Sequence, residues 1–96
     1  MRTIHPGEVL VEDYIEPAGM SIRSVAMALS IPYARLNAIA KGKRPMDADL
    51  ALRLERYFGS EALGWLNLQT AYDLRIAGDS AGNAIAKAIT PLRLPT

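Results

Sequence analysis

The sequence predicts an all-α domain of five helices, and two observations support this prediction. Turn-forming residues interrupt the chain at short intervals, and the segments between them have the length of helices rather than strands. Within these segments apolar residues recur at steps of three and four, and no segment alternates apolar and polar residues with a period of two. We therefore expect helices near 7–16, 22–29, 32–41, 48–58 and 61–76.

The expected helices have recognisable starts and stops. Pro6 suits the first position of a helix, where its missing N–H has no intrahelical partner to lose. Ser21, Asp47 and Ser60 are suitable N-caps for the second, fourth and fifth helices. Three helices are followed by glycines that can adopt the left-handed conformation of a helix stop, namely Gly19, Gly42 and Gly59.

Composition limits the chain to one small domain and excludes several kinds of site. Half of the 96 residues are apolar, which is enough for a core. There is no cysteine and only one histidine, so disulfides and zinc sites lack their ligands. No serine has a His–Asp partner set, and we prefer a helix-capping role for His5. We expect no enzyme activity, catalytic residue, metal, cofactor or small-molecule ligand.

Charge is distributed unevenly along the chain. Residues 1–20 hold one arginine against four carboxylates, so their net charge is −3, whereas residues 21–58 hold seven basic residues against three acidic ones, so theirs is +4. Residues 59–96 balance. A basic segment is the usual footprint of a phosphate-binding face, although such charges also occur as solvated helix surface. Nothing resembles a signal peptide or a membrane span, so we expect a cytoplasmic protein.

The second and third helices form a predicted helix-turn-helix over residues 21–41. Only Ser30 and Ile31 separate them and Pro32 opens the third helix, and two short helices joined so tightly must cross steeply. Ala26 allows close approach of the two helices. The apolar wedge between them is expected to consist of Val25, Leu29, Ile31, Leu36 and Ile39.

The opposite face of the third helix is predicted to bind DNA in the major groove. Asn37 can pair with adenine and Arg35 with guanine, while Tyr33 can reach a phosphate or a base. Ala34 and Ala38 are small enough to let the helix lie deep in the groove. A basic turn that can clamp the DNA backbone follows, with Lys41, Lys43 and Arg44. Geometry alone leaves a non-binding helical bundle open.

Some charged side chains on this part of the chain have a second interpretation. Arg35 borders the buried face, so an ion pair with an acidic side chain is an alternative to a DNA contact. Arg53 and Arg56 are expected to be solvated charges or salt-bridge partners rather than DNA contacts.

The fifth helix carries more apolar surface than a single small bundle covers. We therefore expect core and dimer-interface residues there, namely Trp65, Leu66, Leu68 and Tyr72. Residues 1–76 are expected to form the DNA-binding domain. Residues 77–96 begin with a Gly- and Ser-containing stretch that is typical of a flexible link. Their last part is compatible with a short helix, an extended arm on a partner, or a frayed tail.

An ordered set of motifs over residues 5–76 resembles the HigA (VapI-type) antitoxins, which belong to the Xre-like helix-turn-helix family. The motifs of the first half are His5-Pro6-Gly7-Glu8, Glu16-Pro17 with Gly19, Ala26-Met27-Ala28-Leu29, Arg35-Leu36-Asn37-Ala38-Ile39 and Gly42-Lys43-Arg44. Those of the second half are Ala48-Asp49, Ala51-Leu52-Arg53-Leu54, Phe58-Gly59, Trp65-Leu66-Asn67-Leu68-Gln69 and Ala71-Tyr72-Asp73-Leu74-Arg75.

The resemblance implies a lambda-repressor-like domain that binds double-stranded operator DNA as a homodimer and represses its own operon. It also implies a HigB-like toxin, a ribosome-associated mRNA endonuclease, that the antitoxin neutralises. We expect this toxin to contact surface away from the third helix, at the first helix or the chain ends. A solitary Xre-like regulator and an interaction module without DNA binding are the alternatives.

Two positions depart from the family pattern. Ile22 stands where a glutamine often contacts phosphate, so this contact must pass to Ser21, Arg23 or a backbone N–H, or be lost. Ser30 stands where the turn usually has glycine, and it is strained if the turn requires a positive φ.

Overall fold

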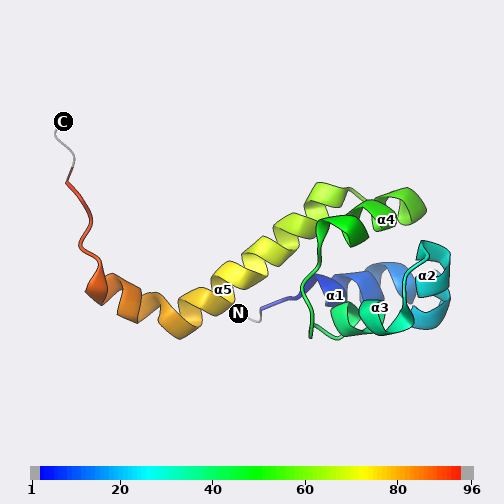
Figure 1. Cartoon of the computed structure of the whole chain (residues 1–96), viewed down its shortest axis with the longest axis horizontal. Coiled ribbons are helices and arrows are strands. Elements are labelled where there is room, and N and C mark those ends of the chain that lie inside the picture. Colours follow the sequence, from blue (N-terminus) through cyan, green and yellow to red (C-terminus); the bar gives the residue numbers. More distant parts are fainter. Residues whose placement is uncertain (1–2, 94–96) are drawn as a thin grey trace.

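The computed structural model describes residues 3–93, and these fold into five helical segments without a strand (Figure 1). The first segment consists of α1 (Pro6–Val9) continued by the π-helical η1 (Leu10–Ile15). The other four are α2 (Ile22–Leu29), α3 (Tyr33–Ala40), α4 (Ala48–Phe58) and α5 (Ala62–Ala88). The prediction of an all-α, five-helix helix-turn-helix fold is confirmed.

The helix starts agree with the sequence except at α5. His5 caps α1 because its Nδ1 accepts the N–H of Gly7 at 2.9 Å, and Pro6 occupies the first helical position. Ser21 forms a capping box with Ser24 at the start of α2. The carboxylate of Asp47 accepts the N–H of Leu50 at 2.8 Å and so caps α4.

Ser60 does not cap α5, contrary to the prediction. The N-cap position belongs to Glu61, whose side chain makes no capping hydrogen bond. The Ser60 hydroxyl instead accepts the indole N–H of Trp65 at 2.8 Å. Trp65 is buried in the core, where an indole N–H without an acceptor would be unfavourable. The Ser60 hydroxyl therefore serves as that acceptor rather than as the cap of α5.

One hydrophobic core joins all the helices. The predicted wedge between α2 and α3 is confirmed, because Ala26, Val25, Leu29, Ile31, Leu36 and Ile39 are all buried. The first helix contributes Leu10 and Ile15, and α4 contributes Leu50, Ala51 and Leu54. Met46 and Trp65 complete the core from the connection before α4 and from α5. Burial on this scale fixes α3 against the rest of the domain, and its outer face is left for other contacts.

The helix α5 is longer than predicted and continues through Ala88 rather than ending near residue 76. Gly78 and Gly82 lie inside it, because a glycine in a helix interior weakens the helix by only about 1 kcal/mol and each of the two follows an alanine. An ion pair between Arg75 and Asp79 at 3.2 Å supports the same turns. Figure 1 shows that the helix bends in its C-terminal half. Residues 94–96 of the predicted tail lie outside the described residues.

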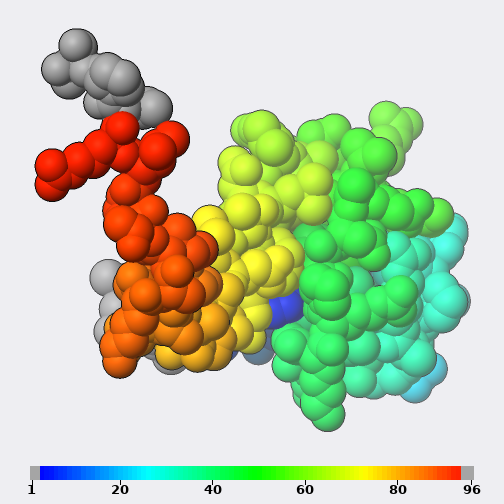
Figure 2. Space-filling model, turned by 60° about the vertical axis from the view of Figure 1, so that its left-hand side comes forward, coloured from blue at the N-terminus to red at the C-terminus, as the bar shows by residue number. Residues whose placement is uncertain are grey.

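The C-terminal half of α5 stands away from the body of the domain. The molecule measures 55 × 27 × 23 Å, and Figure 2 shows the orange turns of α5 apart from the green and cyan body. Apolar side chains remain exposed on this part, for example Ile76 at 46% and Ile85 at 52%. Among the described residues, no helix has the length and apolar character needed to span a membrane.

Candidate nucleic-acid interface

The turn between α2 and α3 is a tight left-handed stop made by Ser30. Its φ of 57° lies in the left-handed region, so the positive φ that would strain a serine is present. The N–H of Ile31 donates to the carbonyl of Ala26 at 3.0 Å, and the N–H of Ser30 donates to Met27 at 3.1 Å. These bonds satisfy the carbonyls of Ala26 and Met27 near the end of α2 and set the direction in which α3 starts.

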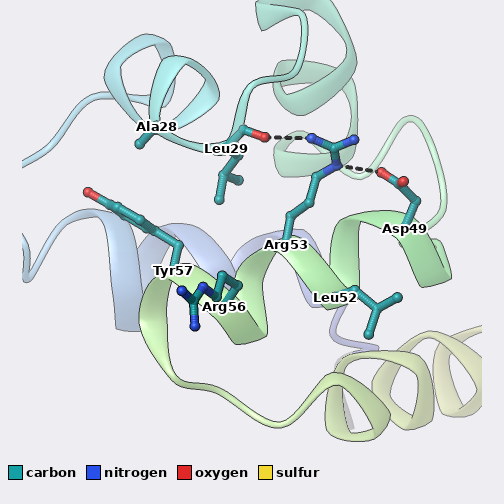
Figure 3. A pocket seen from close by; sticks show the side chains of 7 residues that line it. All are labelled: Ala28, Leu29, Asp49, Leu52, Arg53, Arg56 and Tyr57. Atoms are coloured by element: carbon teal, nitrogen blue, oxygen red, sulfur yellow. Dashed lines mark hydrogen bonds and ion pairs between the residues drawn. The ribbon is translucent and has the colours of Figure 1, made fainter.

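Arg53 of α4 reinforces this turn from behind. Its Nη1 donates to the carbonyl of Leu29 at 2.8 Å, and its Nε donates to Asp49 at 2.7 Å (Figure 3). A cation at the C-terminal end of α2 is also favoured by the helix dipole. The expectation that Arg53 is a salt-bridge partner is confirmed. The spacing of four residues between Asp49 and Arg53 is the sequence signal for their pairing.

Arg35 lies at the border of the outward face of α3 and is held by acidic partners. Its guanidinium contacts Asp47 at 3.0 Å and Asp49 at 3.2 Å, and its side chain is 21% exposed. Burial alone would lower the pKa of Arg35, but the hydrogen bond to Asp49 and the charge of Asp47 raise it above its usual range. The alternative of an ion pair is therefore confirmed, whereas a contact of Arg35 with DNA stays a prediction.

The outward face of α3 is accessible as predicted. Tyr33 and Ala34 at its start and Lys41 after its end are exposed, and Asn37 and Ala38 are half-buried on the same side. The guanidinium of Arg23 lies 4.2 Å from the ring centre of Tyr33. This stacking joins the start of α2 to the start of α3, so both helix starts present a common surface.

Ser21 and Arg23 differ in their freedom to make a phosphate contact. The Ser21 hydroxyl accepts the N–H of Ser24 at 3.0 Å and donates to the Ser24 hydroxyl at 3.1 Å. This hydroxyl is therefore already occupied in capping α2. Arg23 is exposed in the first turn of α2, and capping does not use its guanidinium, which lies over the ring of Tyr33. Of these two candidates, Arg23 has the geometry better suited to replace a contact that Ile22 cannot make.

A basic loop, defined here as residues 42–46, follows α3. Lys43 and Arg44 are exposed, and Gly42 has a φ of 74°. The N–H of Lys43 donates to the carbonyl of Ala38 at 2.9 Å, which folds the loop back onto the end of α3. The loop therefore begins directly beside the last turns of α3.

Comparison with known proteins identifies the type of this domain. The sequence matches no protein-family model. It is 52% identical over 77 residues to Virulence-associated protein I of Dichelobacter nodosus, an alignment that covers 80% of this chain and 71% of the relative. The chain belongs to the HigA (VapI-type) antitoxin family.

Solved structures of HigA-type antitoxins have the same fold over nearly the whole chain. A HigA-family antidote protein from Coxiella burnetii is 46% identical with a TM-score of 0.90, and the match covers 96% of this chain and 100% of that one. Pseudomonas aeruginosa HigA, solved with the higBA promoter, is 38% identical with a TM-score of 0.92 at the same coverage. These matches include the long α5.

In this HigA-type chain the predicted dimer residues have different environments. Trp65 is buried in the core of its own protomer, and its ring lies 5.1 Å from that of Tyr14. Leu66 is partly buried against the same core, and Tyr72 packs on His5 with ring centres 4.9 Å apart. Leu68 is 36% exposed. The core role is confirmed for Trp65, and the dimer role of all four stays a prediction.

Proposed function

We propose that this chain is the DNA-binding antitoxin of a toxin–antitoxin module, which represses its own operon and neutralises a HigB-like mRNA endonuclease. The observation that carries the proposal is the exposed polar face of α3, flanked by a basic loop, in a HigA-type domain. Two relatives of this fold were solved with DNA: Pseudomonas aeruginosa HigA with its promoter, and the antitoxin GraA with its operator.

The proposed contacts divide into base reading and backbone binding. Asn37 lies where a side chain on α3 would meet a base edge in the major groove, and Ala34 leaves room for close approach. Arg23, Tyr33 and Lys41 surround this position and would contact phosphates or sugars. Lys43 and Arg44 would bind the backbone next to the groove. Ser21 contributes mainly by ordering the start of α2, and Arg35 by holding α3 against α4.

The proposed active form is a homodimer assembled through α5. Leu63, Leu74 and Ile85 are exposed apolar residues spaced by eleven positions, which is about three helical turns. They therefore lie on one side of α5, opposite the side where Trp65 packs into the body. A second copy that covers this side would bury Leu74 and Ile85 and place two recognition helices on one DNA duplex.

The toxin is proposed to bind the surface that α3 and the basic loop leave free, so that antitoxin, toxin and operator form one complex. The family comprises antitoxins and regulators, and we expect no enzyme activity, cofactor or small-molecule ligand in this chain. Its site of action is the cytoplasm, where operator and toxin are found.

A mobility-shift experiment tests the proposal with DNA taken from upstream of the gene. We expect a shifted complex at physiological salt that unrelated DNA of equal length does not displace. Co-expression with the adjacent reading frame should yield a co-purifying toxin. It should also restore the growth of cells that the toxin alone inhibits. Absence of specific binding would favour an interaction module without DNA binding, and binding without a toxin partner would favour a solitary regulator.

A further inference from the structure

The basic loop has no regular secondary structure, yet groups far away in the sequence hold it on two sides. On one side lies His5, whose Nδ1 accepts the N–H of Gly7 at 2.9 Å, so that this nitrogen serves as the cap of α1. Burial lowers the pKa of this imidazole, and the backbone of Arg44 beside the ring opposes that shift. His5 is only 6% exposed, and a Cβ on Gly42 would lie 3.6 Å from its ring. The imidazole therefore packs directly beneath the loop.

On the other side the loop is held by Gln69 of α5. Its Oε1 accepts the N–H of Met46 at 2.7 Å, and its Nε2 donates to Asp73 at 2.9 Å. Gln69 and Met46 are 7% and 3% exposed, so this hydrogen bond is shielded from water. A buried backbone N–H that is left without an acceptor destabilises the folded state. The orientation of the amide is fixed because each of its two ends has a partner of the right kind.

The two anchors meet at one cavity. It has a volume of 240 Å³ and separates the basic loop from α5. The rings of His5 and Tyr72 meet edge to face at 4.9 Å on its wall. The position of Lys43 and Arg44 is thus determined by α5 and by the first helix as well as by α3, to which the loop is joined in sequence.

We propose that His5 and Gln69 are positioning residues for DNA binding, which hold the basic loop so that Lys43 and Arg44 reach the DNA backbone. This proposal rests on the proposed DNA-binding function. A side chain that approaches phosphate from a fixed loop loses less conformational entropy on binding than one on a loose loop. Neither anchor needs to touch DNA for this effect.

The variant His5→Asn separates capping from loop anchoring. Asparagine is a preferred N-cap and keeps an acceptor for the N–H of Gly7, but its shorter side chain cannot reach Arg44 or pack on Tyr72. We expect His5→Asn to retain its helix content and thermal midpoint within a few degrees. The slope of log affinity against log salt concentration should become shallower by about 1 to 2 per protomer. Each lost phosphate contact reduces the magnitude of this slope by about 0.9.

A double-mutant cycle decides whether the effect passes through the basic residues. Lys43→Ala with Arg44→Ala should flatten the salt slope in the wild-type background and change it little in the His5→Asn background. Gln69→Ala should behave like His5→Asn, whereas the exposed neighbour Thr70→Ala should behave like wild type. Amide hydrogen exchange of Lys43, Arg44 and Met46 in the free protein should be faster in both anchor variants.

The outcomes separate this proposal from the proposed function. If the wild type does not bind its operator, both fail. If the wild type binds but the two sets of substitutions are additive, or if the salt slope is unchanged in both anchor variants, the positioning role alone is refuted. If His5→Asn does not fold, Gln69→Ala with its Thr70→Ala control gives the same decision.

Discussion

Ser30 is the one non-glycine residue with a positive φ in residues 3–93, and it lies at the turn that orients the recognition helix. A side chain in the left-handed region is disfavoured by about 1–2 kcal/mol relative to the right-handed one. The domain tolerates this because the N–H groups of Ser30 and Ile31 are satisfied and Arg53 binds carbonyls of the same turn.

Ser30→Gly should therefore stabilise the domain by about 0.5–1 kcal/mol, since glycine adopts this conformation without a steric penalty. Chemical denaturation measures the difference, with Ser24→Gly as a control that should destabilise because it removes half of a capping box. A loss of stability in Ser30→Gly would mean that the hydroxyl makes a contribution that the turn geometry does not explain.

The single histidine makes stability depend on pH. Burial lowers the pKa of His5 below its ordinary value of 6.5, against the opposing charges of Asp73 and Glu8 and the hydrogen bond with Arg44. The unfolded chain consequently binds a proton more readily than the folded one. The free energy of unfolding should be highest above about pH 6.5, where His5 is neutral in both states. It should decrease as the pH falls from there toward the lower pKa of His5 in the folded chain. Urea denaturation between about pH 7.5 and 5.5 should show this decrease in the wild type and a flatter profile in His5→Asn.

At the residue scale, the sequence predicts which side chains are exposed where exposure follows the periodicity of a helix. It does not decide the partners of a side chain when those partners are distant in the sequence. Tyr33, Ala34 and Lys41 were placed correctly because the third helix has one buried face. Arg35 stayed ambiguous because it lies at the edge of that face, and its partners are 12 and 14 residues away. Gln69 was missed as a loop anchor because its acceptor atom meets Met46 across 23 residues.

At the scale of elements, α1 and the last turn of α3 are in close backbone contact. A Cβ on Gly7 would collide with the carbonyl oxygen of Ile39, so the backbone of α1 lies directly on the last turn of α3. Gly7 is required here for space, since its own conformation is helical. This contact was not evident from sequence because the motif that contains Gly7 specifies a helix start and says nothing about what packs on it.

Gly7→Ala should destabilise the domain by about 2 kcal/mol or more, because either α1 or the end of α3 must shift. Gly78→Ala is the matched control: a Cβ there meets nothing within 4 Å, and alanine in place of a helical glycine should stabilise by about 0.5–1 kcal/mol. Thermal denaturation followed by circular dichroism compares the two. Equal stability of both variants would show that α1 and α3 are not in such close contact.

The extent of α5 could not be read from the sequence for a physical reason. Gly78, Ser80 and Gly82 are poor helix formers, and a local reading places a link there. The alanines on both sides and the preceding turns favour continuation, since adding residues to an existing helix is easier than starting one. The bend in this part of α5 is consistent with a weak point that stays helical.

At the scale of the whole molecule, one short recognition helix per chain contacts too few base pairs for specific binding. The arm formed by α5 provides a surface on which two chains can form a dimer. Exposed apolar side chains on this arm exceed what a monomer needs for its own packing. With two copies, half-sites about one helical turn apart could be read on one face of the DNA.

Leu74→Glu combined with Ile85→Glu should weaken dimerisation by at least tenfold, because two buried apolar contacts would become buried charges. Sedimentation over a range of concentrations measures the monomer–dimer equilibrium, and operator affinity should fall in parallel. Asn83→Glu adds charge to the same helix at an exposed polar position and should remain dimeric. A dimer that persists in the double variant would place the interface elsewhere.

The central claim is that α3 reads a base sequence while the basic loop binds the backbone. It is tested most directly by measuring affinities at fixed salt for the operator and for operators with each base pair changed in turn. Asn37→Ala should lose about 1–3 kcal/mol of preference at one base pair of each half-site, whereas Lys43→Ala should weaken all sequences alike. An Asn37→Ala protein with unchanged affinity and unchanged preference at every position would contradict the assignment of α3 as the recognition helix.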